Sequence, residues 1–126
     1  MEMLTNAIAW VEIPVVDFER ARIFYSRIFD YEMPVMQMGP TLMGFLLHDR
    51  NSGIGGAIVQ GEDYIPSHTG PLVYLNGGSN LLTVLDRVDD AGGAVLVGKT
   101  HIGPELGYFA IFQDCEGNKL ALHSMG

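Results

Sequence analysis

The sequence describes a small acidic protein with enough apolar residues to form a packed core. Its 126 residues are 48% hydrophobic, and the net charge at pH 7 is −8. Only seven Lys and Arg residues are present, and they are scattered, which argues against nucleic acid or an anionic membrane as a partner. No apolar run is long enough to span a bilayer, and the first residues do not resemble a secretory signal, so we expect a cytoplasmic protein.

The first half of the chain predicts a strand, a helix and three more strands. The first strand alternates, with Trp10 and Glu12 on one face and Val11 and Ile13 on the other. Asp17 suits an N-cap, and apolar residues recur after it at helical spacing, which predicts a helix over residues 18–29. The strands are expected over residues 7–15, 31–38, 42–48 and 54–60.

The second half predicts the same order after a polar linker over residues 61–70. Ser79 or Asn80 can cap a helix over residues 81–91, and Gly92 with Gly93 suits its C-terminal end. Strands are expected over residues 71–76, 94–97, 108–113 and 119–123. The chain therefore consists of two βαβββ modules, residues 7–60 and 71–124. Each is too small to bury a core alone, so we expect one domain over residues 1–126 with a cleft between the modules.

Several motifs resemble those of the vicinal oxygen chelate superfamily, which includes glyoxalase I, fosfomycin and bleomycin resistance proteins, and extradiol dioxygenases. The matching stretches are Val15-Val16-Asp17-Phe18-Glu19-Arg20-Ala21, Phe24-Tyr25, Tyr64-Ile65-Pro66-Ser67, Gly70-Pro71-Leu72-Val73-Tyr74-Leu75-Asn76, Gly107-Tyr108-Phe109-Ala110, Asp114 and Glu116-Gly117-Asn118. The resemblance covers nearly the whole chain and implies an α+β fold in which two βαβββ modules form an open, cup-shaped mixed sheet. It also implies a homodimer, because such sheets leave strand edges that need covering.

The metal enzymes of that superfamily take one His, Glu or Gln ligand from the first and last strand of each module. By the same resemblance, the four positions fall on Trp10, near Gly56-Ala57, near Val73-Tyr74 and on Ala121. None of these side chains is a carboxylate or an imidazole, and a divalent ion needs about four donors held in place. We therefore expect no metal site and no cofactor.

Four residues are candidates for the cleft. Trp10 and Tyr74 could stack a planar ligand, and Glu12 shares the face of Trp10, where a carboxylate beside an indole could act as an acid or a base. His123 shares the face of Ala121 and could approach Glu12. The alternatives are that Glu12 is a rim residue or pairs with an arginine, and that His123 bonds to the backbone.

Other reactive residues have simpler interpretations. His48, His68 and His101 are expected in loops or at strand ends, and Cys115 is expected to be an unreactive turn cysteine between two acidic residues. Four methionines, Met33, Met36, Met38 and Met43, suit ordinary packing or an adaptable binding surface.

Three functions follow from these observations. The first is a glyoxalase-like protein that binds a small organic molecule without metal and whose reaction is unassigned, with Glu12 and His123 as catalytic candidates in a lyase-type enzyme. The second is a ligand-sequestering protein of the bleomycin-resistance type. The third is a metal-dependent lyase with displaced ligands.

Overall fold

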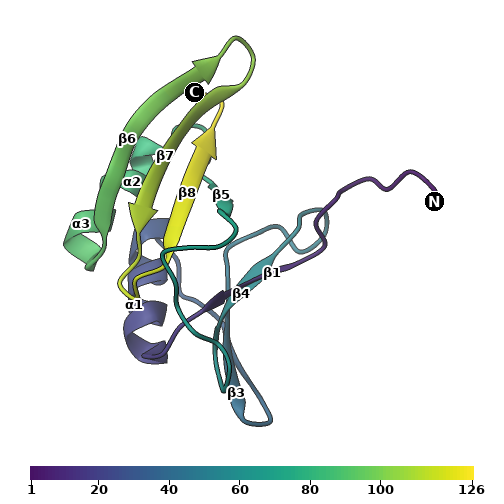
Figure 1. The fold of residues 1–126 in the computed structure, drawn as a ribbon, viewed down its shortest axis with the longest axis vertical. Helices are drawn as coiled ribbons and strands as arrows, with labels where there is room; N and C mark the ends of the chain where they lie inside the picture. Colours follow the sequence, from purple (N-terminus) through teal and green to yellow (C-terminus); the bar gives the residue numbers. More distant parts are fainter.

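The computed structural model describes residues 1–126 and contains two modules that follow one another along the chain (Figure 1). The first module consists of β1 (Val11–Pro14), α1 (Phe18–Phe29), β2 (Val35–Met38), β3 (Thr41–Phe45) and β4 (Gly56–Gln60). The second consists of β5 (Tyr74–Asn76), α2 (Leu82–Leu85), α3 (Val88–Ala91), β6 (Ala94–Gly103), β7 (Gly107–Gln113) and β8 (Lys119–Ser124). None of the helices is both long and apolar enough to span a bilayer.

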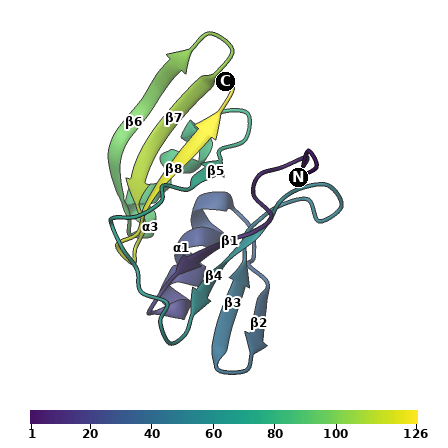
Figure 2. The same cartoon turned by 45° about the vertical axis from the view of Figure 1, so that its right-hand side comes forward.

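The two modules repeat one sheet topology. The strand order is β1-β4-β3-β2 in the first sheet and β5-β8-β7-β6 in the second. In each sheet the first and last strands of the module pair in parallel, and the other neighbours pair antiparallel. Figure 2 shows two open sheets side by side. The predicted α+β fold with two βαβββ modules is confirmed, and within one chain its strands form two four-stranded mixed sheets.

Helix α1 has the bounds that the sequence predicts, because its capping and its apolar spacing agree. The Asp17 side chain caps the first turn by accepting a hydrogen bond from the Arg20 N–H, and Asp30 ends the helix in the left-handed conformation. The residues at helical spacing are buried: Phe18, Ala21, Phe24, Tyr25 and Ile28. Complete burial of a large apolar side chain stabilises the fold by roughly 1.5–3 kcal/mol, so this stripe anchors α1.

Both modules contribute to one main core. Helix α1 packs on one face of the first sheet through Ile13 and Ile58, and it also contacts α2 and α3 of the second module. From the second module the same cluster contains Leu75, Leu81, Val84, Leu85, Val88, Ala110, Phe112, Leu120 and Leu122. The helices therefore lie between the sheets and leave the opposite face of each sheet without a helix.

The single helix predicted over residues 81–91 is wrong in one respect. The structure has two four-residue helices, α2 and α3, and the backbone between them is tightened, with ψ of −13° at Asp86 and −11° at Arg87. There the Arg87 N–H bonds to the carbonyl of Val84, an i to i−3 bond of the 3₁₀ type. The apolar stripe expected on this helix was Leu82, Leu85 and Val88; Leu85 and Val88 are buried, Leu82 is half-buried, and Val84 is buried in addition.

Strand ends differ more from the predictions than helix ends do. Strand β1 begins at Val11 and not at Ala7, and β3 ends at Phe45, which leaves His48 in the following loop. Strand β6 extends to Gly103, so His101 lies within a strand, contrary to the expectation of a loop or a strand end. Register shifts between β6 and β7 explain why alternation did not reveal this extension.

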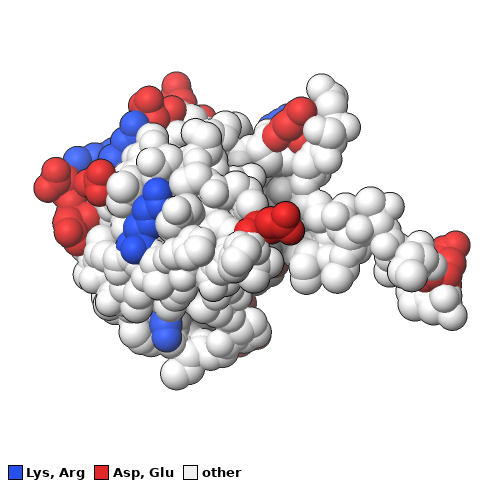
Figure 3. All heavy atoms as spheres, turned by 90° about the horizontal axis from the view of Figure 1, so that it is seen from above, with Lys and Arg blue, Asp and Glu red and all other residues white.

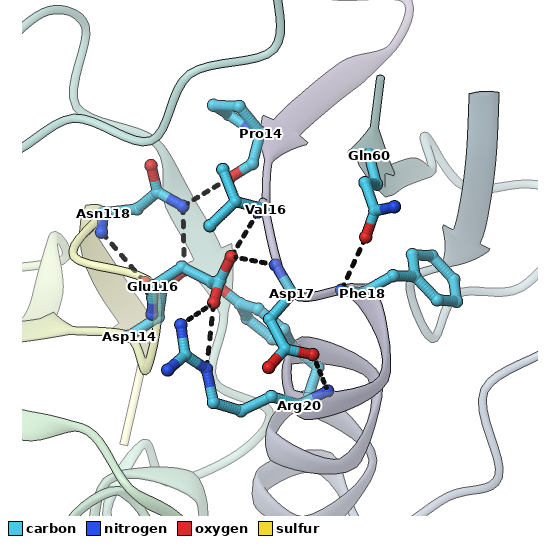
Figure 4. Close-up of polar contacts among 10 residues, drawn as sticks. Pro14, Val16, Asp17, Phe18, Arg20, Gln60, Asp114, Glu116 and Asn118 are labelled. Atoms are coloured by element: carbon cyan, nitrogen blue, oxygen red, sulfur yellow. Dashed lines mark hydrogen bonds and ion pairs between the residues drawn. The ribbon is translucent and has the colours of Figure 1, made fainter. Parts of the chain in front are cut away.

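The turn between β7 and β8 fastens the second module to the start of α1 through Glu116 (Figure 4). One carboxylate oxygen of Glu116 accepts hydrogen bonds from the N–H groups of Val16 and Asp17, and the other accepts the guanidinium of Arg20. The side chain of Glu116 has no exposed surface. Burial raises its pKa, but Arg20 and the two N–H groups outweigh that effect and hold the pKa below its ordinary value.

Two further side chains of this turn complete the connection. Asn118 donates to the carbonyl of Pro14 at 2.7 Å and to the carboxylate of Asp114 at 3.0 Å, and it accepts the N–H of Ser67 at 3.0 Å. The hydroxyl of Tyr25 donates to Asp114 at 2.7 Å inside the core. The module-joining turn, residues 114–118, therefore holds β1, α1 and the linker in fixed positions.

Candidate functional site

The uncovered face of the first sheet carries the candidate site. Cross-strand register places Glu12 beside Ala57 and Ala57 beside Phe45, and it places Met43 beside Val59 on the same face. Ala57, Val59 and Met43 form a small buried cluster that is separate from the main core, and Phe45 and Tyr64 pack against it. The face therefore has an apolar floor with aromatic side chains at its margin.

Three side chains meet above this floor. The Glu12 carboxylate accepts a hydrogen bond from Trp10 Nε1 at 3.3 Å on one oxygen and from the Tyr64 hydroxyl at 2.8 Å on the other. The bond to Glu12 is the main cause that raises the pKa of Tyr64 above its ordinary value. Two neutral donors thus fix the direction of an exposed carboxylate and leave its remaining lone pairs free. We call Trp10, Glu12 and Tyr64, together with Phe45 at the margin of the floor, the Trp10 site.

The predicted division of β1 into two faces is confirmed. The Trp10 side of the strand is open, with Trp10 42% exposed, whereas Ile13 on the other side is 3% exposed and lies in the main core. Val11, on the same side as Ile13, is only half-buried, because it lies over Gly56 near the end of the sheet.

A hollow of about 440 Å³ begins at Trp10. Its lining consists of Trp10, Tyr31, Glu32, Pro34, Met36, Phe45, Leu46, Leu47, His48 and Arg50. The rings of Trp10 and Phe45 meet edge to face, with their centroids 6.2 Å apart. The hydroxyl of Tyr31, another lining residue, donates to the Phe45 carbonyl at 2.7 Å, and burial raises the pKa of Tyr31 to about 12. The hollow is large enough for a small organic molecule.

His123 and Tyr74 lie on the second sheet, in a different hollow of about 500 Å³. Tyr74 is in register with Ala121, so Tyr74 and His123 share the uncovered face of that sheet, as expected. The Nε2 atom of His123 lies 2.7 Å from the carbonyl oxygen of Leu106, so Nε2 carries the proton. This backbone bond is the simpler of the two interpretations given for His123.

The structure does not bring Glu12 and His123 together within one chain. Glu12 bonds to Trp10 and Tyr64, His123 bonds to Leu106, and the two residues belong to separate sheets. Their approach was expected on the basis that the first and last strands are the end strands of their modules, but β8 lies between β5 and β7. In the chain, each of these strands pairs within its own module.

The residues at the four ligand positions do not suit a divalent metal. Trp10, Ala57, Tyr74 and Ala121 offer neither an imidazole nor a carboxylate, and Ala57 and Ala121 are buried. No three His, Cys, Asp or Glu side chains converge anywhere in the chain. We derive no chemistry through a metal at this site.

Cys115 is a poor nucleophile. Burial, followed by the charges of Asp114 and Glu116, raises the pKa of its thiol to about 12.

Tyr64 is the functional candidate that the sequence did not reveal. It lies in the linker, where no strand or helix periodicity assigns a side chain to a face. The surrounding stretch was recognised as a family motif, but a motif of that kind does not say what its tyrosine contacts. Only the path of the linker across the first sheet brings Tyr64 to Glu12.

Comparisons with known proteins agree with this fold. The model of the glyoxalase/bleomycin resistance protein/dioxygenase superfamily matches residues 7–122. A glyoxylase-like domain-containing protein of Didymella fabae is 30% identical over 129 residues, which cover 95% of this chain and 94% of that protein.

Solved structures show the same architecture at low identity. An antibiotic-binding protein from a Streptomyces species has a TM-score of 0.63 and 18% identity, covering 99% of this chain and 100% of its own. A variant of glyoxalase I from Zea mays has a TM-score of 0.66 and 17% identity, covering 92% of this chain and 45% of its own. The fosfomycin resistance protein FosX from Listeria monocytogenes has a TM-score of 0.64 and 17% identity, covering 97% of this chain and 92% of its own. With the family model matching nearly its whole length, the chain belongs to the glyoxalase/bleomycin resistance protein/dioxygenase superfamily.

Proposed function

We propose that this protein binds a small organic molecule at the Trp10 site without a metal ion, in the cytoplasm. The carrying observation is the combination of a hydrogen-bonded carboxylate, an exposed indole and a buried apolar floor on a sheet face that no helix covers. Indole and phenol rings offer a ligand flat apolar surfaces, and Glu12 offers it an oriented acceptor. The antibiotic-binding relative from Streptomyces has the same fold, which is consistent with such a role.

A direct test uses the fact that Trp10 is the single tryptophan of the chain. N-phenyl-1-naphthylamine, an uncharged aromatic probe, should bind saturably and quench the fluorescence of Trp10. Trp10→Ala should weaken the binding at least about tenfold, followed through the fluorescence of the probe, because burial of the exposed indole under a ligand contributes up to a few kcal/mol. Ile65→Ala, which truncates an exposed linker residue, is the matched control and should bind as the native chain does. Binding that is unaffected by Trp10→Ala would refute the proposal.

Metal independence is tested on the purified native protein. Elemental analysis should find zinc, nickel, iron and manganese well below one atom per chain, because the four ligand positions offer no suitable donors. One equivalent of any of these metals would instead support a lyase with displaced ligands, and His123 and Glu12 would then be the first residues to replace.

Catalysis is the second candidate, and the oriented Glu12 carboxylate favours it. An exposed carboxylate with free lone pairs, held by Trp10 and Tyr64, is placed to remove a proton from a bound ligand. His123 would act in such a reaction only if a second chain brought it to the site. Recovery of the bound molecule unchanged after incubation with the native protein would favour sequestration over a lyase-type reaction.

We also propose that two chains form a homodimer in which the Trp10 face of one chain meets the Tyr74 face of the other. Each sheet has one uncovered face and a free edge at β1 or β5, and Trp10 and Tyr74 remain exposed on these faces. Free edges and exposed apolar faces favour association. In such a dimer, the cleft expected between two modules would be built from two chains.

A further inference from the structure

The geometry points to an organic cation, an ammonium or iminium group attached to an apolar or aromatic body, as the ligand of the Trp10 site. This inference rests on the proposed binding function and specifies its chemical class.

The first argument is the charge state of the site's surroundings. The structure contains two ion pairs, Arg20 with Glu116 and Arg22 with Glu19, and neither involves Glu12. Both groups that bond to Glu12, the indole N–H and the tyrosine hydroxyl, are neutral donors. No basic side chain of the protein is therefore paired with the Glu12 carboxylate, and a cationic ligand would supply that partner.

The second argument is the aromatic enclosure. Trp10 and Tyr64 contact Glu12, and Phe45 packs against Trp10, so three rings lie at the site. A ring face attracts a cation through its quadrupole. Aromatic rings together with one carboxylate form the arrangement that suits quaternary and tertiary ammonium groups. An anionic ligand could reach the Trp10 N–H and the Tyr64 hydroxyl only by displacing the Glu12 carboxylate, which accepts a hydrogen bond from each.

The hollow beside the site carries no opposing excess of positive charge. Arg50 and Glu32 both line it, so their charges offset one another, and His48 is the remaining basic group there.

The third argument is the field of the whole molecule. The net charge is −8, which attracts cations to the surface at long range. On the face shown in Figure 3, the projecting N-terminal segment and the surface beside it carry acidic side chains and almost no basic ones. That segment leads into the first sheet, so acidic side chains near the site would favour the arrival of a cation.

The experiment compares three probes of nearly the same size on the native chain: phenyltrimethylammonium, its uncharged isostere tert-butylbenzene, and the anion benzenesulfonate. Each is titrated while the fluorescence of Trp10 is followed. We expect the cation to bind about tenfold more tightly than the isostere, and the anion more weakly than both, because ring and carboxylate interactions with a cation add to the same apolar contact. Added salt should weaken the binding of the cation most.

Two variants assign the preference to one carboxylate. In Glu12→Gln the affinity ratio between phenyltrimethylammonium and tert-butylbenzene should fall to a few-fold. In the matched control Glu105→Gln, which removes one negative charge from an exposed position in the β6–β7 turn, the ratio should stay near its native value. An equal fall in both variants would assign the preference to net charge and would overturn the inference.

The outcomes also separate this inference from the proposed function. If N-phenyl-1-naphthylamine binds at Trp10 but the three probes show no preference for the cation, the inference is wrong and the binding function stands. If no probe binds saturably, both are wrong.

Discussion

At the scale of single residues, strand β1 packs into the core on one face and carries the candidate site on the other. Ile13 points into the core shared with α1, and Trp10 stays open on the opposite face with Glu12. Alternation along a strand produces this division directly, because successive side chains leave the sheet on opposite sides. Stability and binding should therefore respond to different residues of one short segment.

This division can be tested with two truncations. Ile13→Ala should lower the free energy of unfolding by about 2–5 kcal/mol, because it opens a cavity among fully buried side chains. Trp10→Ala should cost distinctly less, since the indole is already 42% exposed, but it should remove ligand binding. Urea unfolding followed by far-UV circular dichroism measures both variants without relying on tryptophan. A larger loss of stability for Trp10→Ala than for Ile13→Ala would mean that the two faces of β1 are assigned the wrong way round.

At the scale of elements, the module-joining turn fixes the backbone between β1 and α1 by direct hydrogen bonds, in addition to the packing of the core. The core buries helices between the sheets, but Glu116 and Asn118 bond directly to the backbone at the end of β1 and the start of α1. Glu12 lies two residues before Pro14, whose carbonyl Asn118 holds. The turn therefore fixes the strand that presents the Trp10 site, although no residue of the turn lies in that site.

Glu116 makes this connection dependent on pH. Its folded pKa lies below the ordinary value of 4.5, so its charge stabilises the fold above that pH, and the stabilisation is lost as the pH falls through the folded pKa. We expect Glu116→Gln to be less stable than the native chain at pH 7, by roughly 1–3 kcal/mol, because the neutral amide cannot replace all of the bonds that the carboxylate accepts.

The difference between the two proteins should shrink as the pH falls below about 4.5, where the native Glu116 takes up a proton. Urea unfolding at a series of pH values measures it. Glu19→Gln removes an exposed carboxylate that pairs with Arg22 on the same helix, and as the control it should change stability much less than Glu116→Gln does. A difference for Glu116→Gln that stays constant down to low pH would contradict the role given to its charge.

The elements also show where sequence reasoning succeeds and where it stops. Helix α1 was predicted to the residue because its cap and its apolar stripe are local signals. The division of the second helix and the extension of β6 depend on tightened turns and register shifts that no local pattern encodes. In the site, alternation placed Trp10 and Glu12 on one face, but the contact of Tyr64 with Glu12 depends on the path of a linker without periodicity.

At the scale of the whole molecule, the two halves of the predicted cleft lie apart. The Trp10 site lies on the first sheet and the Tyr74 face on the second, and Trp10 and Tyr74 line different hollows. The N-terminal segment projects away from both modules (Figure 1), and its apolar residues Met3, Leu4 and Ile8 are exposed. A single chain thus leaves much apolar surface in contact with water, and a second chain is the simplest way to cover it.

The proposed dimer predicts a mass of twice the 13.8 kDa chain in light scattering. It also predicts a specific complementation between two variants, each of which damages one half of the cleft. Trp10→Ala and Tyr74→Ala should each bind N-phenyl-1-naphthylamine weakly when purified alone. When the two are unfolded together and refolded as a mixture, about a quarter of the native binding sites should return. About half of the dimers are then mixed, and each mixed dimer holds one intact pair of Trp10 and Tyr74 from different chains.

The control is a mixture of two differently tagged Trp10→Ala chains, which should recover no sites because no mixed dimer contains Trp10. A native chain that remains a monomer on dilution and concentration would exclude the shared cleft outright. Dimers that form but show no complementation would place Trp10 and Tyr74 in independent sites. In that case a single chain would supply the whole Trp10 site, and Glu12, Phe45 and Tyr64 would be the residues that bind the ligand together with Trp10.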